Sequence, residues 1–199
     1  MKTEIRKTET ADIPEVMALF DRARKTMATL GIDQWQDGYP YVSNVETDVA
    51  LGESYVVTRD GRVAATFVFM EREEPTYKTI DGAWRSDKPY AAIHRITVSP
   101  DARRTAEKCD AKSVSTEIME FVKEKAVRDG FDGGIRVDTH EGNIPMRKML
   151  EKNGFVLCGV IYLESGAPRV AYQFCKALSA IKADSVFVFF KISLNRLLK

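Results

Sequence analysis

The sequence predicts an α+β protein with a mixed central β-sheet and helices on both of its faces. Strand-like and helix-like segments follow one another in the order β-αα-β-β-β-α-β-α-β-β, which is typical of this class. One apolar, β-branched run, Ala91 to Val98, is dense enough to be a central strand buried on both faces. A hairpin signal precedes this run and a second one follows it.

The composition describes one globular domain of ordinary size. The chain has 199 residues, 44% hydrophobic and 30% charged, so it can bury a substantial core. A formal net charge of +1 gives no electrostatic reason to expect nucleic acid or a membrane as a partner. The N-terminus lacks the apolar core of a signal peptide and no apolar run approaches bilayer length, so we expect a cytoplasmic protein. The three cysteines form no C-x-x-C pair, which indicates neither a disulfide framework nor zinc.

The first half of the chain is expected to supply a strand, two helices and a hairpin. Asp12, with Glu15 three residues later and Pro14 in the first turn, resembles a capping box, and Gly31 ends the helix that follows. Asp60-Gly61 joins two β-rich runs and predicts a hairpin turn. The expected elements are a strand at 4–7, helices at 13–30 and 45–51, and strands at 54–59 and 62–70.

The second half begins with the central strand and ends in a second hairpin. Ser99-Pro100 stops the central strand, because proline cannot donate to a ladder. Ser113 is a good N-cap for the next helix, and Asn143 for the one after it. The expected elements after the central strand are a helix from about 113 to 130, a strand at 134–138, a helix from 143 to 153, and strands at 155–163 and 169–174.

Residues 179–199 are basic and apolar, and we expect them to form an extension of a domain that spans residues 1–178. The run Val186 to Phe190 is too apolar to stay solvated, and exposed patches of this kind usually mark contacts. The extension is therefore expected to dock on the domain or on a second subunit, as in a homodimer.

Three segments carry a family resemblance: AIHRITVSP (92–100), VDTHEGNIPMRKMLEKNGF (137–155) and VLCGVIYLESGAPRVAYQF (156–174). They resemble the fourth strand, the fifth strand with the fourth helix, and the terminal hairpin of the GNAT superfamily of acyl-CoA N-acyltransferases. The resemblance spans roughly Ile5 to Leu178. It implies direct transfer of an acetyl group from acetyl-CoA to a primary amine of a small molecule or peptide, in a ternary complex and without a metal.

The family's pyrophosphate-binding loop has the pattern Q/R-x-x-G-x-G/A, because glycine lets backbone amides approach phosphate closely. This sequence has no glycine between Tyr90 and Arg128. Counted forward from Pro100, the loop would occupy residues 103–108. In this part of the chain Arg103, Arg104, Lys108 and Lys112 would meet the CoA phosphates, or would only form a solvated loop face.

We favour a second register, counted back from the following helix, in which residues 110–115 form the loop. The resemblance then makes Lys112, Ser113, Val114 and Ser115 the pyrophosphate-binding residues. A serine in a glycine-type conformation would cost on the order of 1 kcal/mol. The alternative is one long helix over residues 101–128 with no phosphate loop at all.

Other parts of the donor site also follow from the resemblance. The pantetheine arm is expected to pair as a pseudo-strand with the backbone near Ile96 and Val98. Asn143 takes the place of the cap residue that lies beside this arm in the family. Trp35 and Tyr39 would wall a substrate pocket or anchor the core.

The family's usual acid and base are both missing from this chain. Leu150 stands where the family often has an acidic tyrosine, and Ala92 where it often has a glutamate base. His94 lies two residues from Ala92, hence on the same strand face, and histidine titrates near neutrality in water. It is the candidate base, although a buried histidine satisfied by hydrogen bonds is the alternative.

Further candidates come from the last strands. Tyr162 and Tyr172, on the closing hairpin, are candidate replacement acids, or else packing tyrosines. Asp138 and His140 share a strand face and suggest a carboxylate–imidazole pair. Because the glycines, the tyrosine and the glutamate are all missing, a rival reading is a non-catalytic module that binds CoA weakly or acts through protein contacts.

Overall fold

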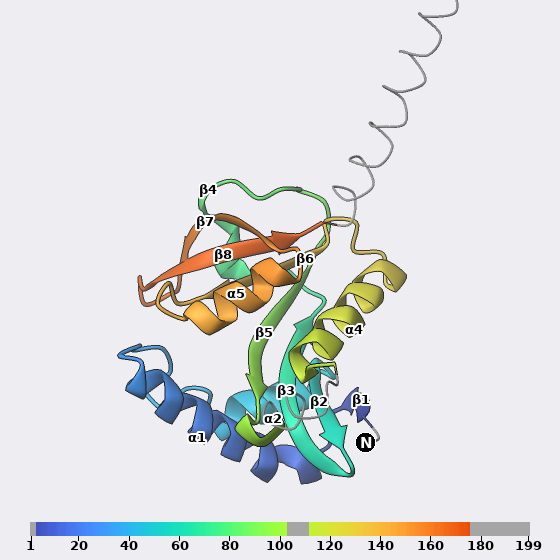
Figure 1. The fold of residues 1–199 in the computed structure, drawn as a ribbon. Helices are drawn as coiled ribbons and strands as arrows, with labels where there is room; N and C mark the ends of the chain where they lie inside the picture. Colours follow the sequence, from blue (N-terminus) through green and yellow to red (C-terminus); the bar gives the residue numbers. More distant parts are fainter. Residues whose placement is uncertain (1–2, 103–111, 176–199) are drawn as a thin grey trace, which may run out of the picture.

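The computed structural model of the chain describes residues 3–102 and 112–175 and confirms the α+β class (Figure 1). Arg103, Arg104, Lys108 and the extension at 179–199 lie outside these residues, so the predictions made for them are not addressed. The strands are β1 (Thr3–Lys7), β2 (Ser54–Arg59), β3 (Arg62–Met70), β4 (Asp81–Gly82), β5 (Ala91–Val98), β6 (Ile135–Thr139), β7 (Val156–Tyr162) and β8 (Pro168–Phe174). The helices are α1 (Ile13–Thr29), α2 (Val42–Ala50), α4 (Val114–Arg128) and α5 (Ile144–Lys152), with short 3-10 helices η1 (Thr10–Asp12) and η2 (Pro75–Lys78).

All described strands belong to one mixed sheet in the order β1-β2-β3-β5-β6-β8-β7-β4. Every neighbouring pair is antiparallel except β5 and β6, which run parallel. These two strands pair only at Ala91 with Ile135 and at Ala92 with Arg136. Beyond these positions they separate, so the middle of the sheet is open toward the C-terminal end of β5.

A β-bulge changes the course of β5 just where it leaves β6. The register with β3 shifts between Thr66 and Val68, and Arg95 has a φ of 55°. A positive φ is uncommon for a residue with a side chain, and bulges of this kind often lie beside functional sites. The bulge changes the direction in which the side chains after His94 point.

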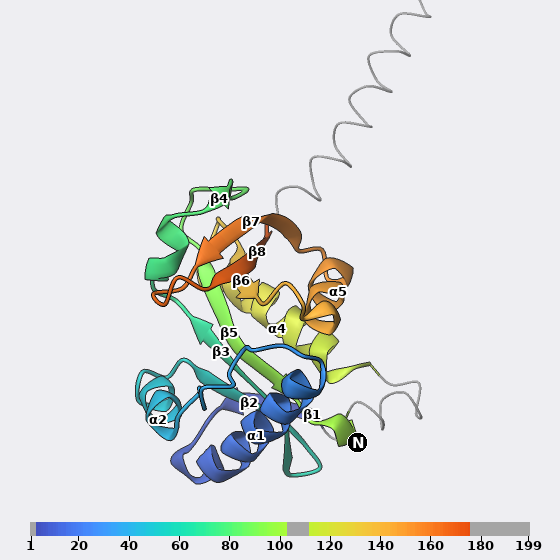
Figure 2. The same cartoon turned by 90° about the vertical axis from the view of Figure 1, so that its left-hand side faces the viewer.

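Helices cover both faces of the sheet, as predicted (Figure 2). On one face, α4 and α5 bury apolar side chains such as Ile118, Val122 and Leu150 against the strands in the largest core cluster. On the other face, α1 and α2 pack Val16, Phe20 and Val45 against β2. The segment around η2 forms a third cluster with β5, β7 and β8 on this second face.

Local sequence signals place most element boundaries correctly. Asp60 and Gly61 have φ values of 49° and 80°, as a tight hairpin turn requires. Ser113 is the N-cap of α4 in an extended conformation, with its hydroxyl accepting a hydrogen bond from the amide of Thr116 at 3.2 Å. The alternative of one continuous helix over 101–128 is therefore wrong.

Two predictions for the first half need correction. Asp12 makes no side-chain cap of α1, because its carboxylate accepts hydrogen bonds from Arg6 at 2.6 and 2.9 Å and from the amide of Glu9 at 2.8 Å. The polar segment between β3 and β5, for which the sequence predicts no element, contains η2 and the short strand β4. Within the described residues, no helix combines the length and the apolar character needed to cross a bilayer.

Candidate active site

Two cavities lie where β5 separates from β6. The first has a volume of about 820 Å³ and the second about 520 Å³. The first is lined by β3, β5, β6 and the segments before α2 and around η2, and the second by α1, the end of β5 and the starts of α4 and α5. Four residues line both cavities: Met27, Ile96, Asn143 and Met146. The cavities therefore meet beside β5.

The second cavity collects six of the seven residues predicted to bind the donor. Ile96 and Val98 of β5, Asn143 at the start of α5, and Ser113, Val114 and Ser115 at the start of α4 all line it. Its opposite wall comes from the C-terminal half of α1, including Arg22, which the sequence did not point to. The backbone of β5 on the side of β6 has no ladder partner beyond Ala92, so its polar groups are available to an extended ligand.

The start of α4 presents backbone amides to this cavity. The amides of Val114 and Ser115 have no acceptor among the described residues, so they can receive an anion at the positive end of the helix dipole. Residues 112–115 show no positive φ, and the strain expected for serine in a glycine-type conformation is therefore absent from this stretch. Lys112 does not line the cavity, because its ammonium pairs with Glu120.

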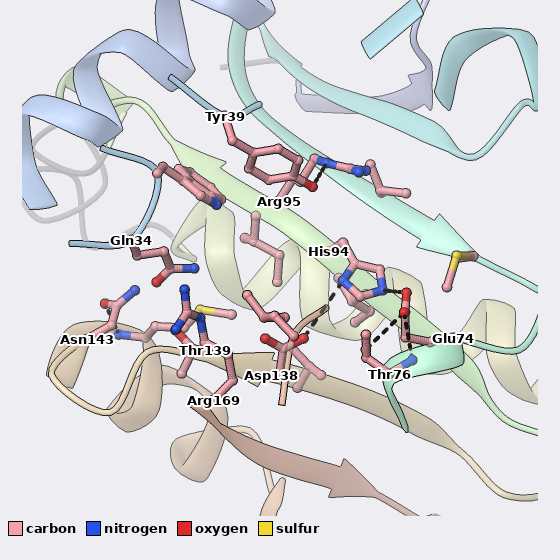
Figure 3. A pocket seen from close by; sticks show the side chains of 18 of the residues that line it. Gln34, Tyr39, Glu74, Thr76, His94, Arg95, Asp138, Thr139, Asn143 and Arg169 are labelled. Atoms are coloured by element: carbon pink, nitrogen blue, oxygen red, sulfur yellow. Dashed lines mark hydrogen bonds and ion pairs between the residues drawn. The ribbon is translucent and has the colours of Figure 1, made fainter. Parts of the chain in front are cut away.

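A cluster of ionisable side chains lines the first cavity around His94 (Figure 3). The Nε2 atom of His94 lies 3.3 Å from Oε2 of Glu74, and its Nδ1 atom lies 4.0 Å from Oδ1 of Asp138. The hydroxyl of Tyr77 donates to the same Asp138 oxygen at 2.7 Å. Burial raises the pKa of Tyr77 well above its ordinary value, so this phenol stays protonated and keeps donating.

Glu74 is held as a carboxylate at the edge of this cluster. It is the N-cap of η2 and accepts hydrogen bonds from the amide and the hydroxyl of Thr76 at 3.2 and 2.9 Å. Burial works against its ionised form, but the contact with His94 and the bonds from Thr76 outweigh burial and lower the pKa of Glu74 from 4.5 to about 2. Glu74 therefore supplies a permanent negative charge beside the imidazole near neutral pH.

A buried ion pair sits at the bulge next to the cluster. The guanidinium of Arg95 donates to Oδ2 of Asp48 at 2.7 Å and to the hydroxyl of Tyr39 at 2.7 Å. Burial raises the pKa of Asp48, although Arg95 opposes that rise. Tyr39 was predicted either to wall a pocket or to anchor the core, and it lines the first cavity together with Trp35.

A model of the acetyltransferase (GNAT) family matches residues 16–155. The chain belongs to this family. A GNAT acetyltransferase from Streptococcus agalactiae has a similar structure, with 30% sequence identity over 87% of this chain and 95% of that one and a TM-score of 0.72.

More distant relatives share the fold. A GNAT acetyltransferase from Listeria monocytogenes is 19% identical over 86% of this chain and 95% of that one, with a TM-score of 0.61. The protein yncA from Salmonella typhimurium, whose structure holds its cofactor acetyl-CoA, is 14% identical over 87% of this chain and 93% of that one, with a TM-score of 0.56. A search among curated proteins found no match.

Both usual catalytic positions of the GNAT family are occupied here by buried apolar side chains. Ala92 and Leu150 are fully buried in the core. The predicted replacement tyrosines do not line either cavity. Tyr162 is exposed on β7 and donates to Asp81 at 2.7 Å, whereas Tyr172 is fully buried, accepts from Arg147 at 3.0 Å and donates to Glu151 at 3.1 Å.

The expected pairing of Asp138 with His140 is wrong. Strand β6 ends at Thr139, so the alternation of side chains does not extend to His140. Its Nδ1 atom accepts from the amide of Gly142 at 3.0 Å, and its Nε2 atom lies 3.3 Å from Asp33. Asp138 faces His94 instead. Among residues 3–102 and 112–175 no group of three or more His, Cys, Asp and Glu side chains is placed to hold a metal ion, and the expected metal-free reaction stays a prediction.

Replacing Glu74 by glutamine is expected to change how stability depends on pH. Because the folded-state pKa of Glu74 is about 2 and the ordinary value is 4.5, its stabilising contribution is complete above about pH 4.5 and is lost as the pH falls toward 2. The contribution has an upper limit of ~3 kcal/mol. In urea unfolding, the gap in stability between wild type and Glu74→Gln should therefore shrink from pH 7 to pH 3.5. Glu73→Gln, at an exposed neighbour, is the control, and a constant gap for Glu74→Gln would contradict the assignment.

Proposed function

We propose that this chain is an acetyl-CoA-dependent N-acetyltransferase that transfers the acetyl group directly to a primary amine in a ternary complex. The observation that carries the proposal is that a cavity suited to the donor meets a cavity lined with ionisable groups beside β5. Ile96, Asn143 and Met146 line both cavities and mark where the thioester and the amine would come together.

The donor would lie in the second cavity. The free backbone edge of β5 near Ile96 and Val98 suits the amide groups of a pantetheine arm, because such pairing does not depend on side chains. The amides of Val114 and Ser115 suit the pyrophosphate. The Oδ1 atom of Asn143 caps α5 by accepting a hydrogen bond from the backbone amide of Met146 at 3.3 Å. The side-chain NH2 group of Asn143 is therefore available to the pantetheine arm.

The acceptor would lie in the first cavity, with its ammonium group between Asp138 and His94. The 4.0 Å gap between Asp138 and Nδ1 of His94 is too long for a direct hydrogen bond, so both atoms face the same space. Asp138 binds the ammonium, His94 takes one proton at Nδ1, and Glu74 stabilises the resulting imidazolium at Nε2. The nitrogen then forms the amide bond as the thioester C–S bond breaks, and its second proton goes to the departing sulfur. Tyr162 and Tyr172 lie outside both cavities, and the proposal gives neither of them a role.

The rival reading, a non-catalytic module, has less support. It rested on the missing glycines and on the missing acid and base. The amides at the start of α4 offer a replacement for the glycine loop, and the His94 cluster offers one for the base. No separate acid is required, because the second proton of the amine goes to the sulfur. Binding of acetyl-CoA separates the two readings.

The proposal is tested first by the effect of acetyl-CoA on thermal unfolding. Ligand at 100 times its dissociation constant adds about 2.7 kcal/mol of stability. For a domain of this size, that raises the melting temperature by roughly 5 to 10 °C. Ser115→Asp should abolish most of the rise, because it places an anion at the phosphate position, although a charge in the first turn of α4 favours the helix itself.

Ser43→Asp is the matched control, since Ser43 is also the second residue of its helix, α2, and does not line the second cavity. It should retain the full rise. A wild-type melting curve that millimolar acetyl-CoA does not move would favour the non-catalytic module. Release of CoA thiol in the presence of amines then tests the transfer itself.

A further inference from the structure

Arg169, at the start of β8, is a cation in the first cavity that has no acidic partner among the described residues. Its guanidinium donates to the carbonyl of Pro168 at 2.8 Å and forms no ion pair within residues 3–102 and 112–175. The other cationic or titratable basic side chains lining this cavity all have an acidic partner: Arg72 with Glu53 at 3.1 Å, His94 with Glu74 at 3.3 Å and Arg95 with Asp48 at 2.7 Å. Arg169 is half-buried, so a ligand in the cavity can reach a charge that the protein itself does not neutralise.

The strand register places Arg169 on the same face of the sheet as Asp138. Asp138 pairs with Ala171 across the ladder, and Arg169 lies two residues from Ala171 on the same strand face. Diagonal neighbours of this kind are roughly 7 to 8 Å apart. The two opposite charges nevertheless form no ion pair: Tyr77 donates to the carboxylate of Asp138, and the guanidinium of Arg169 donates to the carbonyl of Pro168.

Figure 3 shows these charges on two sides of one space. The guanidinium of Arg169 points into the cavity near Asn143 and Thr139, whereas Glu74 and His94 lie beyond Asp138. A ligand that spans this space meets a cation at one end and an anion with a base at the other. A zwitterion that carries both a carboxylate and an ammonium group has the complementary charges.

We infer that the acceptor is an α-amino acid or a closely similar aminocarboxylate, whose carboxylate binds Arg169 while its ammonium binds Asp138. The inference rests on the proposed function and names the substrate class of that site. Arginine suits the role because its planar fork can bind a carboxylate through two parallel hydrogen bonds. A peptide N-terminus or a simple alkylamine lacks the carboxylate and leaves Arg169 without a partner.

The test compares L-amino acids with their own carboxamides as acceptors at saturating acetyl-CoA, measured by release of CoA thiol. Wild-type enzyme should have a KM about 10- to 100-fold lower for the acid than for the carboxamide with the same side chain. Arg169→Gln should remove this preference by raising the KM for the acid and leaving that for the carboxamide unchanged. Arg169→Lys should restore part of it. Arg62→Gln, at an exposed arginine that lines neither cavity, should leave the preference unchanged.

Equal use of acids and carboxamides by the wild type would overturn the inference. An equal effect of Arg169→Gln on both substrates would do the same, because it would show a general structural role. If acetyl-CoA raises the melting temperature but no amino acid is turned over, the substrate class is wrong and donor binding stands. If acetyl-CoA has no effect on melting, the proposed function fails, and the inference fails with it.

Discussion

Replacing His94 by alanine is expected to lower turnover by about 10²- to 10⁴-fold, the usual contribution of a general base. Acetyl-CoA binding should be nearly unchanged, because His94 does not line the second cavity. A group that acts on the proton in the transition state lowers kcat and kcat/KM together when it is removed. The measurement is steady-state release of CoA thiol, with the melting temperature with and without acetyl-CoA as the check on donor binding.

His140→Ala is the matched control, since the chain has two histidines and His140 lines neither cavity. It should keep turnover within a few-fold of wild type. If His94→Ala keeps full turnover and only lowers the melting temperature, His94 is a buried structural histidine and the base is another group. Glu74→Gln should also slow turnover, but less than His94→Ala, because the imidazole that accepts the proton is still present.

Replacing Arg95 by methionine is expected to cost about 3 to 5 kcal/mol of stability at neutral pH. The change removes one partner of a buried pair and leaves the carboxylate of Asp48, whose side chain is 8% exposed, without its cation. The melting temperature should fall by roughly 10 °C or more. Methionine has a similar volume and, like arginine, carries a Cβ atom. The change therefore creates no large cavity and leaves the strain of the positive φ at position 95 as it is.

The double variant Arg95→Met with Asp48→Asn should recover much of this loss, because no charge is then left buried.

The loss of stability caused by Arg95→Met should also depend on pH. Burial already raises the pKa of Asp48, and loss of Arg95 raises it further, so the folded state takes up a proton as the pH falls toward 4 and the destabilisation shrinks. Arg72→Met, at an arginine whose side chain is 55% exposed, should cost less than about 1 kcal/mol. A loss for Arg95→Met no larger than this would show that the buried pair contributes little.

Local chemistry made the elements of this fold predictable. The turn at Asp60-Gly61, the caps at Ser113 and Asn143 and the limits of β5 each depend on residues a few positions apart. Asp12 failed as a cap because Arg6, on another element, binds its carboxylate more strongly than the helix amides do. Competition of this kind is not visible in a local pattern.

The residues of the second cavity were predictable for a related reason, and the cluster around His94 was not. The predicted donor-binding groups belong to the backbone of β5 and to the ends of α4 and α5, so finding these elements finds the groups. Glu74 was missed because residues 71–88 have no periodic pattern, and only the docking of η2 brings Glu74 to His94. Arg95 did carry a signal for a neighbouring pair, since a charge inside a buried strand requires a buried partner, and that partner is Asp48.

The hairpin tyrosines show what strand alternation alone cannot decide. The sequence places Tyr172 on a strand, but not on the face that meets a cavity. In the structure Tyr172 pairs with Val137 and faces the core under α5, whereas its neighbour Ala171 pairs with Asp138 and shares the face of the cluster. A shift of one residue in register would have exchanged these roles.

The two edge strands of the sheet, β1 and β4, affect whether copies of this protein can associate through strand pairing. At one margin, β4 pairs with β7, and Gly82 and Gly159 approach so closely that a Cβ on either would collide with the opposite backbone. At the other, β1 has the sequence TEIRK, in which charged residues outnumber apolar ones. Short or charged margins of this kind discourage the addition of a foreign strand. Self-association by continuous pairing of sheets between molecules, which seeds fibrils and many aggregates, is therefore disfavoured at both ends of the described sheet.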